Sequence, residues 1–371
     1  MVTVVYSHDG NNQYDLLFLD HLAKKNLVYL LTFYRNPTFV SPKTRIMKLP
    51  GILSAPTQKA EGLYMYVFFL PRALLLRIFC RIVKPHIVLG NMATKYGFYT
   101  AVSRLRPFLL IIWGSDILIA PKRFFLFRLM AQYTLKKADA VIVDSDVQKK
   151  AALQLGCDPK KILKFPWFNT SSVKAYRARS DVRKELGWLT NPIVICVRKH
   201  NPLYRVEDLV EAVPQVLKAL PEVRFLLVGQ GQLTDLLKQR VRELRVEDRV
   251  KFTGNLSRED TITYLNASDI YVSTSMSDGA SSSLLEAMTL KIPPIVTDIL
   301  GNREWITDGL NGYLTPVGNS PEIAKKIIKL AGNVELRRSI GDNAYKTIED
   351  RVDWDRNTMS LDTLISRLIK K

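Results

Sequence analysis

Short apolar runs in the second half of the chain alternate with longer segments of helical periodicity. Mostly apolar runs bounded by turn residues are typical of buried strands, and apolar residues three and four positions apart are typical of amphipathic helices. The predicted strands cover residues 192–198, 223–229, 250–254 and 269–275, and the predicted helices cover 206–220, 233–244 and 258–268. This alternation predicts a parallel sheet with helices on both faces.

The first half shows the same alternation with less regular spacing. Strands are predicted at 2–7, 26–33, 86–91, 108–114 and 140–145, and helices at 13–25, 71–84, 96–105, 122–137 and 146–155. The 371 residues are enough for two domains. The polar and irregular segment 171–192 is expected to join them, and the tail, residues 354–371, is expected to be helical.

Basic residues are concentrated in the first half. Residues 1–175 contain 25 Lys and Arg against 9 Asp and Glu, an excess of +16, whereas the whole chain has a net charge of +19. An excess of positive charge confined to one half of the chain indicates an acidic partner that binds there. Nucleic acid, anionic lipid and a phosphorylated acceptor are all possible partners of this kind. Two segments that interleave apolar and basic residues, 72–84 and 121–137, favour an anionic membrane surface. Taken alone, residues 72–84 also fit an ordinary, partly buried helix with Arg77, Arg81 and Lys84 on its solvent-exposed face.

A membrane span is not expected. The most apolar stretch, residues 64–83, contains three arginines, and each costs about 2.5–3.5 kcal/mol at a bilayer centre. The N-terminus is predicted to begin directly with a strand and not with a signal peptide. Cys80, Cys157 and Cys196 lack close spacing, which indicates reduced cytoplasmic thiols and neither a disulfide framework nor a zinc site.

The strand, Ser/Gly loop and helix of residues 269–288 carry candidate chemistry. Asp278 lies in the loop, and Glu286 is expected in the first turn of the helix. Backbone N–H groups at a helix N-terminus bind phosphate, and a nearby carboxylate accepts hydrogen bonds from sugar hydroxyls. This combination describes a nucleotide-sugar site. The alternative is a capping box between Ser283 and Glu286.

Four motifs follow one another from this point: LLEAM, PIVTD, GNREWI and DGLNGYL. In this order they resemble the donor domain of retaining glycosyltransferases of family four, well over residues 193–330 and weakly in the first half. The resemblance implies the GT-B fold, with two doubly wound Rossmann-like domains facing a central cleft. Residues 1–175 would bind the acceptor, residues 190–350 would bind the donor, and the helix at 354–371 would pack back on the first domain.

The resemblance also implies roles for residues of the second domain. Glu286 would hold the ribose hydroxyls, and Asp278 matches the acid that contacts the donor sugar, although the family usually has Glu there. Arg198 would face the diphosphate, with Lys199 or Arg205 in place of a lysine that the family has and this chain lacks. The backbone of the loop and the segment after PIVTD would border the donor, which adds Gly279, Ala280, Ser281, Asn302 and Arg303.

In the first domain, the sequence WGSD stands where many family members have His-Gly-x-Asp. Trp113 replaces the histidine, and Asp116 remains a candidate on the acceptor side. His8 and Asp9 follow the first strand and are cleft elements by position, and the alternative is that they form a simple turn. The resemblance implies that neither a metal nor a cofactor is needed. Asp144 and Asp146 have the spacing of a metal-binding Asp-x-Asp, but they open a predicted helix and fit a capping role.

The resemblance implies a metal-independent retaining glycosyltransferase. The donor would be a UDP- or GDP-sugar, and the acceptor a lipid-linked or envelope-polysaccharide intermediate. The protein would be cytoplasmic and peripherally associated with the inner face of the cell membrane. A soluble sucrose- or trehalose-type synthase and a nucleotide-sugar hydrolase or epimerase remain alternatives. A nucleic-acid-binding protein would explain the charge but not the motifs in residues 277–314, and no RNA- or DNA-binding signature is present.

Overall fold

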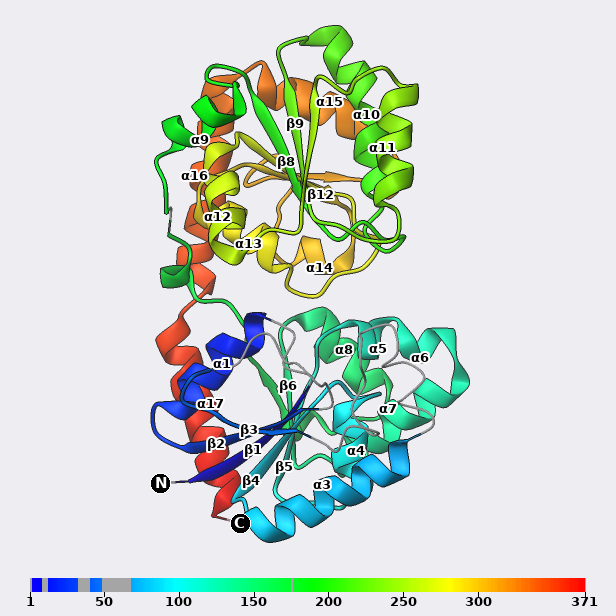
Figure 1. Ribbon diagram of the computed structural model, residues 1–371, viewed down its shortest axis with the longest axis vertical. Coiled ribbons are helices and arrows are strands. Elements are labelled where there is room, and N and C mark those ends of the chain that lie inside the picture. The colour runs from blue at the N-terminus through cyan, green and yellow to red at the C-terminus, as the bar shows by residue number, and fades with distance from the viewer. Residues whose placement is uncertain (1, 9–12, 33–40, 49–67, 175, 371) are drawn as a thin grey trace. The chain divides into compact units, whose positions relative to one another are not determined.

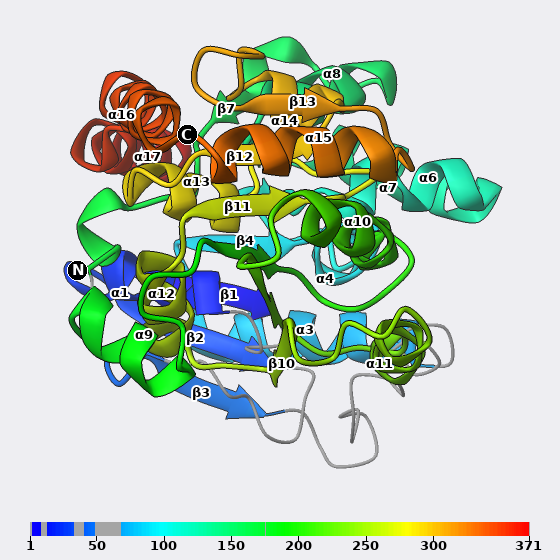
Figure 2. The ribbon, with the colours of Figure 1, turned by 90° about the horizontal axis from the view of Figure 1, so that it is seen from above.

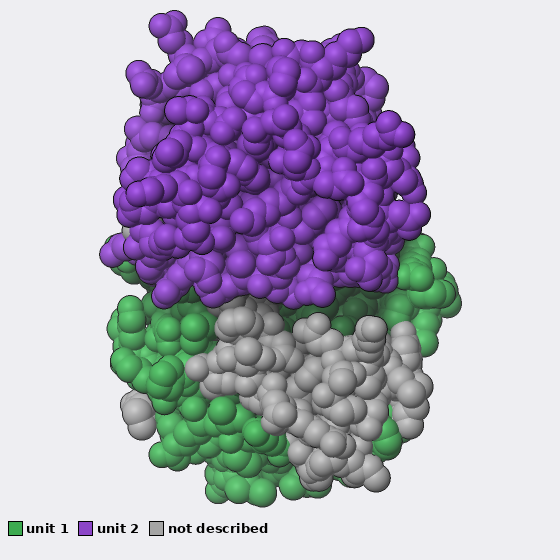
Figure 3. Space-filling view, turned by 45° about the horizontal axis from the view of Figure 1, so that its top comes forward, with its two compact units in different colours: residues 1–167, 355–371 green, residues 168–354 purple. Residues whose placement is uncertain are grey.

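The computed structural model describes residues 2–8, 13–32, 41–48, 68–174 and 176–370. It divides the chain into two compact units, of which unit 1 comprises residues 1–167 and 355–371 and unit 2 comprises residues 168–354 (Figure 3). Asp9, a candidate from the sequence, lies outside the described residues. Each described unit is a parallel sheet with helices on both sides (Figure 1).

The sheet of unit 1 has the strand order β3-β2-β1-β4-β5-β6-β7, and all its pairings are parallel. The strands are β1 (Thr3–His8), β2 (Leu27–Thr32), β3 (Arg45–Lys48), β4 (Ile87–Asn91), β5 (Phe108–Ile111), β6 (Ala140–Val143) and β7 (Ile162–Lys164). The five strands predicted from the sequence are confirmed. The two that were missed, β3 and β7, are short edge strands of four and three residues, and neither contains a buried residue.

The helices of unit 1 cover both faces of its sheet. They are α1 (Gln13–Ala23), α3 (Phe69–Val83), α4 (Tyr96–Val102), α5 (Ser115–Leu118), α6 (Ala120–Arg123), α7 (Phe125–Lys137), α8 (Asp146–Gln154) and α17 (Trp354–Ile369). The tail is therefore helical, as predicted. Asp362 of α17 accepts hydrogen bonds from His21 Nε2 at 3.0 Å and Lys25 Nζ at 3.3 Å, so the last helix lies beside α1.

The sheet of unit 2 has the order β10-β9-β8-β11-β12-β13 and is also parallel. Its strands are β8 (Ile193–Val197), β9 (Arg224–Val228), β10 (Val250–Gly254), β11 (Ile270–Ser273), β12 (Pro294–Thr297) and β13 (Tyr313–Thr315). Its helices are α9 (Arg179–Leu186), α10 (Val206–Ala219), α11 (Thr234–Glu243), α12 (Arg258–Ala267), α13 (Ser282–Thr289), α14 (Leu300–Arg303), α15 (Ser320–Ala331) and α16 (Val334–Arg351). All strands and helices predicted between residues 192 and 275 are confirmed.

Both faces of the unit 2 sheet are buried because successive strand residues point to opposite sides. Val194 and Cys196 of β8 pack into a core with α10, α11 and α15, whereas Ile193 and Ile195 pack into a second core with α9, α12, α13 and α16. Figure 2 shows α10 and α15 next to each other. A sheet buried on both faces explains why its strands read as continuous apolar runs.

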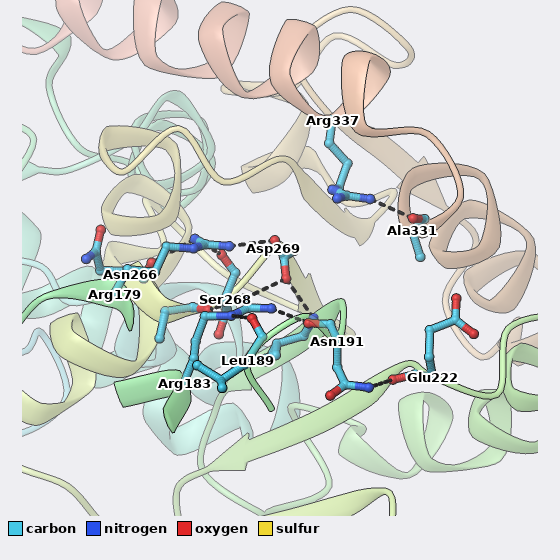
Figure 4. A network of polar contacts seen from close by, with 12 residues as sticks. Arg179, Arg183, Leu189, Asn191, Glu222, Asn266, Ser268, Asp269, Ala331 and Arg337 are labelled. Atoms are coloured by element: carbon cyan, nitrogen blue, oxygen red, sulfur yellow. Dashed lines mark hydrogen bonds and ion pairs between the residues drawn. The ribbon is translucent and has the colours of Figure 1, made fainter. Parts of the chain in front are cut away.

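The segment expected to be an irregular joint contains helix α9, which two arginines fasten to the sheet (Figure 4). Arg179 donates to the Asn266 and Ser268 carbonyls at the end of α12, each at 2.8 Å. Arg183 pairs with Asp269 at 3.1 Å, and Asp269 also accepts from the Ile193 backbone at the start of β8. The polar residues that suggested a loop are therefore the ones that anchor a helix.

None of the helices in the described ranges is long and apolar enough to cross a membrane. Cys80, Cys157 and Cys196 are free and buried. Burial raises the pKa of the Cys196 thiol to about 12.

Candidate functional site

The strand order of unit 2 reverses at β8, which makes β8 and β11 the topological switch point of the sheet. The chain runs from β8 outward through β9 and β10, then returns to form β11 on the other side of β8. The loops that follow β8 and β11 therefore diverge at the carboxyl edge of the sheet, where ligands bind in open α/β folds. Arg198 follows β8 and Asp278 follows β11, so two predicted residues meet at this point.

Arg198 links the two loops through its guanidinium. Nε donates to Ser273 Oγ at 2.8 Å, and Nη2 donates to Asp278 Oδ2 at 2.9 Å and to Ser281 Oγ at 2.5 Å. The Tyr204 ring lies 5.2 Å from the guanidinium carbon, at a distance typical of a cation–π contact. Nη1 makes no hydrogen bond with any residue that the structure describes, so it retains two donors for a ligand.

Burial and charge oppose each other at this pair. The side chains of Arg198 and Asp278 are only 9% and 14% exposed. Burial disfavours the Arg198 cation and lowers its pKa. The charge of Asp278, with smaller contributions from Tyr271, Tyr204 and Cys196, outweighs burial, so the pKa of Arg198 is raised. Burial also raises the pKa of Asp278, while Arg198 and the Ser275 hydroxyl oppose that increase. Arg198 is therefore a permanent cation, held in one orientation.

The loop after β8 is tied to the loop after β11. The Met276 N–H donates to the Leu203 carbonyl at 2.9 Å, and Thr274 Oγ1 donates to the Tyr204 carbonyl at 2.8 Å. Tyr204 was not singled out in the sequence, although an aromatic residue in the loop that begins at Arg198 was a usable signal.

The structure distinguishes the two basic residues between which the sequence could not choose. Arg205 Nε and Nη2 each donate to the Asp208 carboxylate at 2.7 Å, which commits this guanidinium to the start of α10. Lys199 is exposed and forms no ion pair with a described residue. Lys199 is therefore the available cation beside Arg198.

Two glycines bring the loop after β9 against the loop after β8. A Cβ at Gly229, which has a φ of 129°, would lie 2.1 Å from the Arg198 carbonyl oxygen, and one at Gly231 would lie 2.3 Å from that of His200. Only glycine allows this approach. The Gly-rich stretch thus supports the position of Arg198.

Glu286 lies deeper in α13 than the sequence suggested. The helix begins at Ser282 with Ser281 as its N-cap, so Glu286 belongs to the second turn and not the first. Ser283 Oγ is hydrogen-bonded to Tyr271 Oη at 2.8 Å, and Glu286 Oε1 accepts from Arg258 Nη1 at 2.7 Å. The capping-box alternative is therefore wrong.

The Glu286 carboxylate is almost fully buried, with 3% of the residue exposed. Burial raises its pKa, whereas Arg258, and to a lesser extent Arg198, oppose that increase. Arg258 was not predicted from the sequence. The usable signal was its place at the first position of α12, where the helix dipole disfavours a cation.

The loop before α13 contains the other predicted donor residues. Ser281 accepts from Arg198 through its hydroxyl, while Gly279 and Ala280 lie between Asp278 and the helix. A Cβ at Gly301 would lie 2.2 Å from the Asp278 carbonyl oxygen, so the start of α14 packs directly on this loop. Gly279 is not among the glycines with positive φ.

Asn302 and Arg303 make local contacts in α14. Asn302 is 1% exposed, and its Nδ2 donates to the Thr297 carbonyl at the end of β12 at 2.7 Å. Arg303 is exposed and forms a bidentate ion pair with Asp298, in which Nε donates to Oδ1 at 2.5 Å and Nη2 donates to Oδ2 at 2.7 Å. Asn302 thus fixes the segment, and Arg303 is the residue of the two that solvent reaches.

In unit 1, aromatic rings gather at the carboxyl edge of the sheet. The ring of His8, the last residue of β1, stacks on Trp113 at 5.9 Å, and Trp113 stacks on Trp167 at 6.0 Å. Trp113 Nε1 donates to Asn91 Oδ1 at the end of β4, at 2.8 Å. The structure therefore brings two predicted residues, His8 and Trp113, together beside the β1–β4 switch point.

Asp116 is buried behind this cluster with 1% exposed. Its carboxylate accepts from the Ala93 N–H at 2.7 Å and from the Trp113 N–H at 3.1 Å. Burial raises its pKa, and these backbone groups oppose the increase. In the described structure Asp116 positions Trp113 and does not reach a surface where an acceptor could bind.

The Asp144–Asp146 segment has local structural contacts. Ser145 caps α8 by accepting from the Gln148 N–H, and Asp146 pairs with Lys164 at 2.9 Å. Among the residues that the structure describes, no group of three His, Cys, Asp or Glu could hold a metal ion.

Two family models match the chain. Residues 178–347 match the model described as glycosyl transferases group 1, and residues 69–145 match the model described as glycosyl transferase 4-like. The first covers most of unit 2 and includes Arg198, Asp278 and Glu286.

Individual proteins are also similar. An uncharacterized glycosyltransferase of Methanocaldococcus jannaschii is 28% identical over 251 residues, which make up 66% of this chain and 63% of that protein. The N-acetyl-alpha-D-glucosaminyl L-malate synthase of Bacillus anthracis is 30% identical over 190 residues, 51% of this chain and 49% of that protein. The chain thus spans less than two thirds of the length of either relative.

The fold is shared with a solved structure. The crystal structure of HepE from Anabaena in complex with UDP-glucose matches over 99% of this chain and 100% of that chain, with a TM-score of 0.81 and 21% identity. At this identity the likeness shows the fold and not the activity. By its two family models and its two parallel α/β units, the chain belongs to the group 1 glycosyltransferases and has their GT-B fold.

Proposed function

We propose that this protein is a retaining glycosyltransferase that takes its sugar from a UDP- or GDP-activated donor bound by unit 2. The observation that carries the proposal is Arg198, which three hydrogen bonds fix at the β8–β11 switch point and whose Nη1 makes no hydrogen bond with a described residue and can therefore donate to an anion. The HepE structure, solved with UDP-glucose, supports a nucleotide-sugar donor for this fold. Retention rests on the family resemblance.

The chemistry required of the site is neutralisation of a leaving nucleoside diphosphate. A preorganised cation in a poorly hydrated site stabilises developing negative charge without reorganising during the reaction. Arg198 provides such a cation, and the exposed Lys199 adds a second. The N-terminus of α13, which directly follows the Asp278–Ser281 loop, adds backbone N–H groups that favour phosphate.

The carboxylates of Glu286 and Asp278 are proposed to bind the ribose and the transferred sugar of the donor. Glu286 would accept hydrogen bonds from the ribose hydroxyls, and Asp278 would accept one from the sugar while its other contacts hold Arg198. With charge supplied by arginine, lysine and a helix end, the proposed mechanism needs no metal ion or cofactor.

The proposed acceptor is lipid-linked or an envelope-polysaccharide intermediate at a membrane face, because unit 1 has an apolar and basic surface. One stripe along α3 is formed by Leu70, Leu74, Ile78 and Ile82, which are spaced four residues apart and are 42–75% exposed. Arg77, Arg81 and Lys84 flank this stripe and are also exposed. A helix of this kind inserts apolar side chains between lipids while its cations contact anionic headgroups.

A second exposed patch lies at the junction of α6 and α7. Its apolar members are Phe124, Phe125, Leu126 and Leu129, and Lys122, Arg123 and Arg128 are exposed among them. Phe98 of α4 contacts a ring on each of these helices, since it lies 6.1 Å from Phe69 of α3 and 6.1 Å from Tyr133 of α7. The two patches therefore belong to helices of one unit that both pack against α4, which supports a common membrane-facing surface.

A thermal-unfolding screen against UDP, GDP, ADP and their sugars tests the donor. A ligand at about 100 times its Kd should stabilise the protein by about 2.7 kcal/mol. Saturable stabilisation by UDP or GDP, with release of the nucleotide from the matching sugar, supports the proposal. Salt-sensitive binding of oligonucleotides without any response to nucleotides would instead favour a nucleic-acid-binding protein.

A further inference from the structure

Arg258 bridges two segments that are far apart in the chain. Its Nη1 donates to Glu286 Oε1 at 2.7 Å, and its Nη2 donates to Ser172 Oγ at 3.0 Å. Ser172 Oγ in turn donates to the Asn169 carbonyl at 2.6 Å, just after the point where the chain enters unit 2. One guanidinium is thus held by a buried carboxylate on one side and by the entry segment on the other.

We infer that Arg258 is a positioning residue for nucleotide binding, which keeps the Glu286 carboxylate ionised and oriented toward the ribose hydroxyls. The inference rests on the proposed function and extends it to a residue outside the motifs that carry the family resemblance. Arg258 acts through Glu286 and needs no contact with the nucleotide.

The need for such a residue follows from the burial of Glu286. A carboxylate with little solvent contact is ionised only if a nearby positive charge or hydrogen bonds replace its hydration. The charges facing Glu286 are Arg258 from α12 and, more weakly, Arg198 from the loop after β8. Because Arg198 is committed to Asp278, Arg258 is the direct partner that the described structure provides.

Orientation follows from the fork of the guanidinium. A planar group held at both Nη atoms has less freedom than one held at a single atom. Ser172 therefore fixes the direction from which Arg258 approaches Glu286, and the remaining carboxylate lone pairs are left for donors such as ribose hydroxyls.

The direction in which pH should change nucleotide affinity follows from the pKa of Glu286. Burial raises the pKa of Glu286, and removal of Arg258 takes away the largest opposing contribution, so this pKa rises further. The carboxylate then becomes protonated at higher pH, and a protonated group accepts the ribose hydroxyls less well. In an Arg258→Gln variant, nucleotide affinity should therefore fall more steeply on acidification than in the wild type.

The experiment measures the Kd of UDP and GDP by calorimetry between about pH 6 and about pH 8.5. On the acidic side, Arg258→Gln should bind about tenfold more weakly for each unit by which the pKa of Glu286 rises. Glu286→Gln should bind UDP and GDP weakly at every pH. In the double variant, which combines Arg258→Gln with Glu286→Gln, the Kd should no longer show the pH dependence that arises from Glu286. Arg240→Gln is the matched control, because it breaks an exposed Arg–Glu pair in the same unit and should leave both Kd and pH profile unchanged.

Two further variants separate positioning from simple stabilisation of the fold. Arg258→Lys keeps a cation but not the fork, so it should retain the wild-type pH profile with weaker binding. Ser172→Ala should weaken binding slightly with the same profile. If Arg258→Gln does not fold, a shifted pH profile in Arg258→Lys would overturn the inference.

The outcomes also distinguish this inference from the proposed function. Wild-type protein that binds neither UDP nor GDP would overturn the proposed function. Wild-type binding that is lost in Glu286→Gln but unchanged in Arg258→Gln would overturn only the inference. Tighter binding by Arg258→Gln would show that Arg258 competes with the nucleotide, which also overturns it.

Discussion

Arg198 Nη2 and Asp278 Oδ2 are 2.9 Å apart, and this ion pair joins the end of β8 to the loop after β11. The two residues are 80 positions apart in sequence, and the strands that they follow, β8 and β11, are neighbours in the sheet. Because both are largely buried, removal of either one leaves an uncompensated charge, at a cost of about 3–5 kcal/mol in comparable pairs. Each residue therefore fixes the other, and variants of the two must be interpreted together.

Arg198→Ala should lower turnover by roughly 10²–10³-fold, as the loss of one preorganised donor does in other enzymes. Initial rates of nucleotide release from the donor sugar are the measurement, with thermal unfolding recorded in parallel. Arg198→Lys is the control for charge, since it keeps a cation but cannot reach Ser273, Asp278 and Ser281 together. Wild-type turnover in a folded Arg198→Ala protein would contradict the assignment.

Glu286→Gln should weaken nucleotide binding, because an amide oxygen accepts a hydroxyl hydrogen bond less well than a carboxylate does. The expected loss is about 1.5–3 kcal/mol, typical of a hydrogen bond to a charged group. Calorimetric titration with UDP and GDP measures it. An unchanged Kd in the folded variant would mean that the buried carboxylate serves only to pair with Arg258.

Asp278→Asn should lower turnover and leave the binding of free nucleotide nearly unchanged, in contrast to Glu286→Gln. The asparagine keeps the size of the side chain and one acceptor for Arg198, so free nucleotide should bind nearly as well as in the wild type. Turnover should fall, because the carboxylate proposed to contact the donor sugar is gone. Equal loss of nucleotide binding and turnover would assign Asp278 to the nucleotide and not to the sugar.

Removal of divalent ions with EDTA should leave the rate of transfer unchanged. The reason is that Arg198, Lys199 and the start of α13 are proposed to neutralise the diphosphate without a metal. Rates measured before and after chelation, with and without added Mg²⁺ or Mn²⁺, decide the matter. Activity that EDTA abolishes and Mn²⁺ restores would refute this account of the diphosphate site.

The sequence predicted strands reliably where both faces of a sheet are buried. β8 and β9 read as continuous apolar runs because each face contributes to a core. β3 has no buried residue and β7 has only three residues, so neither produces a periodic signal. The polar segment that contains α9 was read as a loop because its arginines bind carbonyl groups about 85 residues away, which local periodicity does not reveal.

The candidate site was predictable only where its residues follow strand ends. Arg198 and Asp278 both do, so topology alone brings them together. The pairing of Arg258 with Glu286 joins two helices, and nothing in the local spacing indicates it. For Arg205 the signal was present and was missed, since its partner Asp208 is three residues away in the first turn of α10.

The last prediction concerns attachment of unit 1 to lipid. Arg77, Arg81 and Lys84 lie beside the exposed apolar stripe of α3, and each cation near an anionic surface contributes about 1 kcal/mol. Replacement of all three by Gln should lower co-sedimentation with vesicles that contain anionic lipid. High salt should release the wild type, because the interaction decays over a Debye length of about 8 Å at physiological ionic strength.

Two comparisons make this prediction specific to the surface. Replacement of Lys149, Lys150 and Lys160, three exposed cations on and after α8, removes the same charge elsewhere in unit 1 and should reduce binding less. Leu74→Ser with Ile82→Ser removes apolar groups without changing charge and should also weaken binding, because insertion of the stripe contributes independently of electrostatics. Nucleotide-sugar hydrolysis should be unaffected in all of these variants, since the residues lie outside unit 2. Equal sedimentation of the wild type with neutral and anionic vesicles would leave the basic surface without a lipid partner.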